Sequence, residues 1–125
     1  MKKLLLLLLC VPLVGFSQKN ENLHKPDSVK ARFILLTNYN FSVDSAFTTL
    51  NVIRNKVIRG ADFGQLATQF SEDKGSAIKG GDLGWFTEGV MVPEFQEACF
   101  NSEIGDLIIV YTRFGTCLIQ IMDNR

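Results

Sequence analysis

Apolar and polar positions change their rhythm along the chain, and each rhythm predicts an element. Residues 31–37 hold a short apolar run, which is typical of a buried strand. After a turn-like stretch, Ser42 can cap a helix whose apolar positions recur at spacings of three and four. These positions are Val43, Phe47, Leu50, Ile53 and Val57. We expect this stripe to lie in the core and Gly60 to end the helix.

After this helix, the pattern predicts a second short helix, a loop, a strand, a third helix and a hairpin. Asp62, with Gln65 three residues later, resembles a capping box that starts this helix, which we expect to pack on the first. The glycine-rich residues 71–81 predict a surface loop. A strand is expected at 83–86, a helix that begins at Pro93, and a hairpin. The two strands of the hairpin are expected at 107–112 and 116–122.

The resulting order is β-α-α-β-α-β-β. Helices inserted between the first and second strands, and again before the last two, indicate an α+β domain with a small, mostly antiparallel sheet. The length of 125 residues fits a single domain.

The N-terminus has the pattern of an export signal. Lys2 and Lys3 precede an apolar run at residues 4–14, which is too short to span a bilayer, and small residues follow near Ser17. We therefore predict a signal peptide at 1–17, a flexible linker at 18–30 and a folded domain at 31–125. Two alternatives are a retained N-terminal anchor and a lipid attached to Cys10.

Composition narrows the chemistry. Thirteen basic and thirteen acidic residues give a net charge of zero, so no general positive field would attract nucleic acid. The three cysteines lack the paired spacing of zinc sites, and His24 is the only histidine, so we expect no metal and no cofactor. Cys99 and Cys117 either pair as a disulfide in an oxidising compartment or remain two buried thiols.

Several separated motifs lie between residues 31 and 123. They are GADF at 60–63, FSED at 70–73, GGDLGWF at 80–86, and then Gly89, Met91, PEF at 93–95 and ACF at 98–100. This pattern closely resembles the parvulin family of peptidyl-prolyl isomerases. The resemblance implies a four-stranded, mostly antiparallel sheet wrapped by helices. It also implies rotation about the bond before proline, without covalent chemistry and against a barrier of about 18–20 kcal/mol.

The resemblance also assigns site residues. Leu83, Met91 and Phe95 match positions that line the proline pocket, and Phe114 matches an aromatic position beside it. Asp73 matches the polar position that faces the isomerising bond. Judged from the residues alone, the first three would be ordinary core, Asp73 a solvated carboxylate and Phe114 a hairpin hydrophobe.

Two departures from the family concern its usual histidines. Parvulins usually carry one histidine in the first strand and one in the last, and these align here with Phe33 and Cys117. The sequence therefore leaves two hypotheses open. One is an isomerase that works through an apolar pocket. The other is a catalytically silent module that binds peptides. A hydrolase or metal enzyme is disfavoured because His24 is the only histidine.

The expected partners are unfolded or extended polypeptides that contain proline. Phosphate-directed parvulins carry a basic cluster after the first strand, and residues 37–41 contain no lysine or arginine. We therefore predict a hydrophobic residue before the proline instead of a phosphorylated one. We further expect a monomer, located in the periplasm or secreted, that assists the folding of exported proteins.

Overall fold

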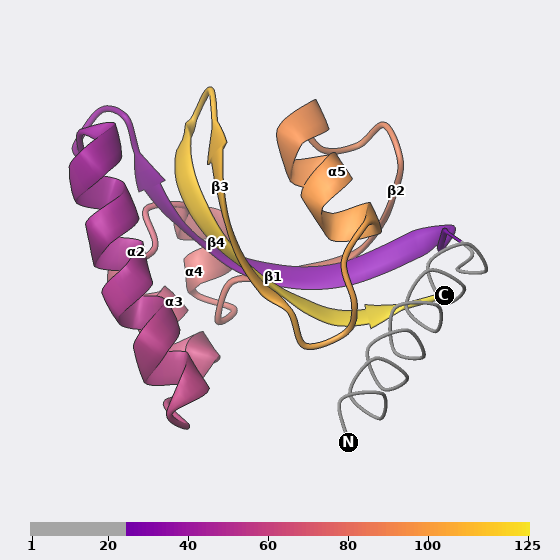
Figure 1. The fold of residues 1–125 in the computed structure, drawn as a ribbon, viewed down its shortest axis with the longest axis horizontal. Coiled ribbons are helices and arrows are strands. Elements are labelled where there is room, and N and C mark those ends of the chain that lie inside the picture. Colours follow the sequence, from indigo (N-terminus) through magenta and orange to yellow (C-terminus); the bar gives the residue numbers. More distant parts are fainter. Residues whose placement is uncertain (1–24) are drawn as a thin grey trace, which may run out of the picture.

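The structure is a computed structural model that describes residues 25–125. The predicted signal peptide at 1–17, Cys10, His24 and most of the predicted linker lie outside the described residues. Figure 1 shows the elements in their spatial arrangement. They are β1 (Ser28–Thr37), α2 (Val43–Ile58), α3 (Phe63–Phe70), α4 (Lys74–Ala77), β2 (Asp82–Thr87), α5 (Pro93–Phe100), β3 (Leu107–Thr112) and β4 (Gly115–Asn124).

The four strands form one antiparallel sheet in the order β2-β1-β4-β3. The two long strands, β1 and β4, pair along most of their length at the centre. β3 and β2 form the two edges. This arrangement confirms the predicted α+β class with a four-stranded antiparallel sheet.

Helices cover the two faces of the sheet unequally (Figure 1). One face packs against α2 and α3, and the other packs against α5. Because side chains alternate across a strand, neighbouring residues of β4 belong to different clusters. Leu118 lies in the core under α2, and Cys117 and Ile119 lie in the core under α5.

The first strand begins earlier than predicted. The sequence predicts a linker at residues 18–30, but β1 already starts at Ser28. Main-chain hydrogen bonds explain the difference, because Ser28 and Arg125 exchange two of them, each 3.0 Å long. Pairing with the end of the chain extends the strand beyond its apolar run.

The predicted loop at 71–81 contains the short helix α4, so the element order has one more helix than expected. The amide of Ala77 donates to the carbonyl of Asp73 at 2.9 Å. The Thr68 hydroxyl, on the preceding helix, donates to the carbonyl of Ala77, also at 2.9 Å. Because α4 is a single turn stabilised by a hydrogen bond from α3, it is too short to show an apolar periodicity in the sequence.

The helix caps were predicted better than the buried stripe of α2. Ser42 accepts the amide of Ser45 as its cap, as expected. The stripe is rotated, however, because Ala46 is buried whereas Val43 and Phe47 are about half exposed. Asp62 caps Gly64 instead of forming a box with Gln65, and α3 packs chiefly on β1 and α4.

None of the helices within residues 25–125 is long and apolar enough to cross a membrane.

Candidate active site

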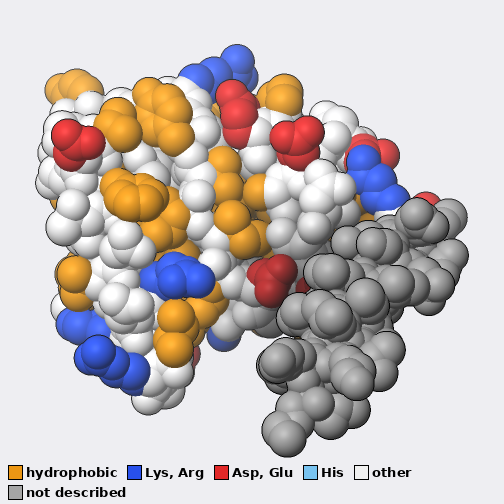
Figure 2. Space-filling model, in the orientation of Figure 1, with side chains coloured by type: hydrophobic (Ala, Val, Ile, Leu, Met, Phe, Trp, Pro, Cys, Tyr) orange, Lys and Arg blue, Asp and Glu red, His pale blue; other side chains and the backbone are white. Residues whose placement is uncertain are grey.

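A cavity of about 380 Å³ opens on the face of the sheet that α5 covers. Figure 2 shows hydrophobic side chains around the middle of the visible surface, between α2 and α5. Strands β1 and β4, the β3–β4 turn and the segment before α5 all contribute to the lining. The lining residues are Phe33, Leu35, Thr37, Asp73, Leu83, Val90, Met91, Val92, Phe95, Thr112, Phe114 and Cys117.

All seven residues singled out from the sequence line this one cavity. They come from five separate segments of the chain. The structure therefore brings the whole set together around one cavity.

Aromatic side chains and a thiol form the inner part of the cavity. Phe33 on β1 and Phe95 on α5 meet edge to face, with ring centroids 5.5 Å apart. The Phe86 ring is tilted against Phe95, with ring centroids 6.3 Å apart. Phe95 is almost fully buried and packs in the core, and one surface of its ring also lines the cavity. The interpretation of Phe95 as a core residue and its interpretation as a pocket residue are therefore compatible.

The two described cysteines are free and buried, so the structure shows the buried thiols and not the disulfide. Burial, followed by the neighbouring Cys117 thiol, raises the pKa of Cys99 to about 12. Burial also raises the pKa of Cys117 to about 12, with a further upward effect from Asp73, against a hydrogen bond from Thr112. Cys117 is therefore neutral near pH 7 and cannot serve there as a base or nucleophile.

Asp73 reaches the cavity through a segment bound to the edge of β1. β2 pairs with only the first half of β1 and leaves the far half free for Ser71 and Glu72. The Ser71 hydroxyl accepts the amide of Leu35 at 3.1 Å and that of Asp73 at 3.3 Å. The amide of Glu72 donates to the carbonyl of Leu35 at 2.7 Å. This pairing fixes the backbone on which Asp73 stands.

The Glu72 carboxylate completes the attachment. One of its oxygens accepts the amide of Thr37 at 2.8 Å and the hydroxyl of Thr37 at 2.7 Å, and the other accepts the Asn40 side chain at 2.7 Å. Desolvation would raise the pKa of Glu72, but these hydrogen bonds and the charge of Lys74 together hold that pKa below its usual value. The carboxylate is therefore ionised near pH 7.

Asp73 also accepts a short hydrogen bond from the Ser76 hydroxyl on α4. Because Ser76 is buried, its hydroxyl fixes the Asp73 carboxylate from the interior of the domain. Asp73 is the only charged side chain among the residues that line the cavity.

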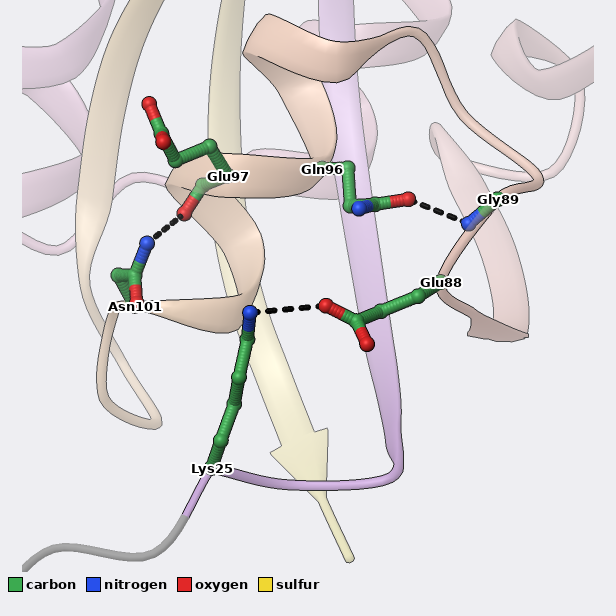
Figure 3. A network of polar contacts seen from close by, with 6 residues as sticks. All are labelled: Lys25, Glu88, Gly89, Gln96, Glu97 and Asn101. Atoms are coloured by element: carbon green, nitrogen blue, oxygen red, sulfur yellow. Dashed lines mark hydrogen bonds and ion pairs between the residues drawn. The ribbon is translucent and has the colours of Figure 1, made fainter.

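The segment between β2 and α5 forms the opposite rim, with Val90, Met91 and Val92 facing the cavity. Figure 3 shows the polar contacts that fix the start of this rim segment. The Gln96 side chain accepts the amide of Gly89, and Lys25 forms an exposed ion pair with Glu88 at 2.8 Å. The first contact ties the segment to the helix that follows it.

The β3–β4 turn supplies the third side of the cavity. The buried Thr112 hydroxyl donates to the carbonyl of Gly115 at 3.0 Å and accepts the amide of Phe114 at 3.2 Å. Phe114 is 56% exposed, and the Arg113 guanidinium lies 5.0 Å from the centre of its ring. The turn is therefore braced at its base, and its aromatic side chain is left open to solvent.

Sequence reasoning missed five residues that line the cavity: Leu35, Thr37, Val90, Val92 and Thr112. Leu35 and Thr37 follow Phe33 at intervals of two, so strand alternation could have placed them on the same face. The valines flank Met91 directly. Thr112 gave no comparable signal, because its position depends on the pairing of β3 with β4.

The cavity can bind an apolar ring and remove water from a neighbouring amide. Within residues 25–125, no group of three histidine, cysteine or acidic side chains is arranged to hold a metal ion. The side chains present favour binding and distortion of a substrate rather than covalent chemistry.

Comparison with known proteins decides the family. A family model described as the PPIC-type PPIase domain matches residues 14–125. The chain belongs to the PPIC-type peptidyl-prolyl isomerase family. The predicted parvulin relationship is thereby confirmed.

Relatives of this PPIC-type domain are found among foldases and chaperones. The foldase protein PrsA of Oceanobacillus iheyensis is 40% identical over 102 residues, which are 81% of this chain and 31% of PrsA. The chain spans less than a third of the length of the curated relatives it matches.

Solved structures give the same relationship. A PpiC-type isomerase domain solved at 1.55 Å superposes with a TM-score of 0.71 and 25% identity, covering 81% of this chain and 94% of that domain. A structure described as that of the SurA-like chaperones PEB4 and the periplasmic protein Cj1289 of Campylobacter jejuni gives a TM-score of 0.65 and 29% identity. It covers 90% of this chain and 44% of that one.

Proposed function

We propose that this domain speeds rotation about the bond before proline by means of shape, desolvation and the charge of one carboxylate. The observation that carries the proposal is the cavity itself, which combines an apolar lining with the single charged group of Asp73. Leu83, Met91 and Phe95 would enclose the pyrrolidine ring, and Phe114 would cover it from the exposed side.

The carboxylate of Asp73 can act on the charge distribution of the amide. In the planar amide, resonance places negative charge on the carbonyl oxygen, and this charge decreases as the bond twists. A carboxylate facing that oxygen would disfavour the planar form more than the twisted one, which lowers the barrier. Phe33 and Cys117 would supply a dry floor, where this electrostatic effect is stronger than in water.

We further propose that the clients are extended, proline-containing segments of exported proteins. Two of the relatives support this role, since one is named a foldase and the other structure is described as that of chaperones, one of them periplasmic. The absence of lysine and arginine from residues 37–41 favours a hydrophobic residue before the proline. The protein would act as a monomer.

A second function is a silent module that binds proline-containing segments without turning them. It is favoured by Phe33 and by the neutral Cys117, because neither side chain can exchange a proton near pH 7. Both functions use the same cavity. They differ in whether the bound amide rotates faster.

Exchange NMR on short peptides with a hydrophobic residue before proline separates the two functions. We expect the wild-type protein to accelerate cis/trans exchange, Met91→Ala to weaken peptide binding by about tenfold, and Asp73→Asn to lower the bound rate more than the affinity. A peptide that binds with unchanged exchange would establish the silent module. A phosphorylated residue before proline that binds tightest would contradict the predicted specificity.

A further inference from the structure

The two edges of the sheet differ in how they are protected. At one edge, β2 contains Gly84, and the register of its pairing with β1 shifts after Ala31. The Arg125 guanidinium also covers Trp85 on this strand, 4.1 Å from the centre of the indole ring. At the other edge, β3 has the sequence LIIVYT, with no charge, glycine, proline or bulge. Long apolar edges of this kind are open to pairing with another extended chain.

Pairing with β4 fixes which groups of β3 face outward. In an antiparallel pair, every second residue directs both main-chain groups at its partner, and the residues between direct theirs away. The Arg54 side chain on α2 donates to the carbonyl of Leu107 at 3.1 Å, so Leu107 belongs to the outward set. Ile109 and Tyr111 share that register, and their main-chain groups have no strand partner within residues 25–125.

The open part of this edge is the part nearest the cavity. Arg54 occupies the carbonyl of Leu107, at the far end of β3. The near end runs through Tyr111 to Thr112, which itself lines the cavity, and then to Phe114 on the rim. An extended chain that leaves the cavity along this edge would therefore meet the outward main-chain groups of Tyr111 and Ile109.

The surroundings of the edge are apolar. Tyr111 is 51% exposed, and Phe47 on α2, which packs against β3, is 49% exposed. Figure 2 shows hydrophobic side chains spread over the region of α2 and β3. An uncharged strand with such neighbours suits a hydrophobic chain better than a charged one.

We propose that the outward edge of β3 at Ile109 and Tyr111 binds the client polypeptide as a fifth strand while its proline occupies the cavity. This inference rests on the proposed function and extends it, because the edge would select extended apolar segments by their main chain. The occupant is the client and not a second copy of the domain, because the open end of this edge leads directly to the cavity in which the client's proline would lie.

Substitution at Tyr111 tests the edge with a matched control. Tyr111→Pro removes the outward amide, and Tyr111→Thr removes the side chain but keeps that amide. Binding is measured with a short X-Pro peptide and with a long one that extends about six apolar residues on both sides of the proline. We expect Tyr111→Pro to weaken binding of the long peptide about fivefold relative to Tyr111→Thr, with equal binding of the short one.

Amide hydrogen exchange of the wild-type protein gives an independent readout that needs no variant. The long peptide should slow exchange at Ile109 and Tyr111, and the short peptide should not. Equal binding of the long peptide by both variants, or unprotected amides at saturation, would overturn the proposal. Protection that rises with protein concentration and without peptide would show a second copy instead and would also overturn it.

The outcome is separable from that of the isomerase proposal. Cis/trans exchange of the short peptide reports on the cavity alone, so a silent cavity would leave exchange unchanged whether or not the edge protects its amides.

Discussion

The two faces of the sheet bury similar side chains, but only one face is closed. On the α2 side, Leu50 and Leu118 are fully buried together with the facing residues of β1. On the α5 side, Leu83 and Met91 pack only partly against the core and line the cavity. The candidate site is therefore the part of an apolar face that no helix covers.

Helix length accounts for the difference. α2 has 16 residues and α5 has eight, which correspond to about 24 Å and about 12 Å. The shorter helix covers the sheet near Phe95 and Cys99 and leaves the end near Thr112 open. The same side chains that would be core under a longer helix are therefore available to a ligand.

The largest effect is expected from a cavity made in the closed face. Leu50→Ala removes a fully buried side chain between α2 and the sheet. We expect the free energy of unfolding to fall by about 2–5 kcal/mol. Urea denaturation measures the change.

Met91→Ala provides the matched comparison on the open face. Because Met91 is only partly buried, its truncation should cost less than Leu50→Ala and should reduce peptide binding. Equal losses of stability at the two positions would show that the open face is as tightly packed as the closed one.

A smaller effect is expected where the Asp73 segment attaches to β1. Glu72→Gln turns an amide group toward Asn40, so a donor faces a donor, and we expect a loss of about 1–2 kcal/mol. Because the folded pKa of Glu72 is lowered, its contribution is fully present above the unfolded pKa of about 4.3. That contribution is lost as the pH falls through the folded pKa.

Urea denaturation of wild type and Glu72→Gln across this pH range checks the sign. The two proteins should differ at neutral pH and converge in acid. A difference that stays constant with pH would mean that the ionised carboxylate does not stabilise the segment.

The smallest effect is expected at the ion pair behind the other rim. Lys25 and Glu88 are 53% and 50% exposed, so solvent screens their attraction. Glu88→Gln should change the free energy of unfolding by less than about 1 kcal/mol and leave peptide binding unchanged. A clear loss of binding would show that this pair, and not Gln96, positions the rim.

The fold was predictable wherever local pattern and tertiary packing agree. The strands at the hairpin, the Ser42 cap and the helix that begins at Pro93 all carry local signals. The start of β1 at Ser28 and the helix α4 were missed, because distant partners and not local periodicity stabilise them.

The candidate site was predictable only through the family motifs. Leu83 and Met91 are apolar residues of the kinds that also fill the core. The periodicity of the sequence does not show that α5 is too short to cover them. The attachment of Asp73 through Glu72 depends on the unpaired half of β1, which only the sheet register reveals.

The pH dependence of catalysed cis/trans exchange tests the central claim most directly. We assign the acceleration to an apolar cavity whose Cys117 stays neutral up to a pKa of about 12 and whose Phe33 has no ionisable group. Exchange of a hydrophobic X-Pro peptide should be accelerated equally from about pH 6 to about pH 9, the range in which histidines and activated thiols titrate. A catalysed rate that titrates within this range, or a bound peptide whose exchange is not accelerated, would contradict the account.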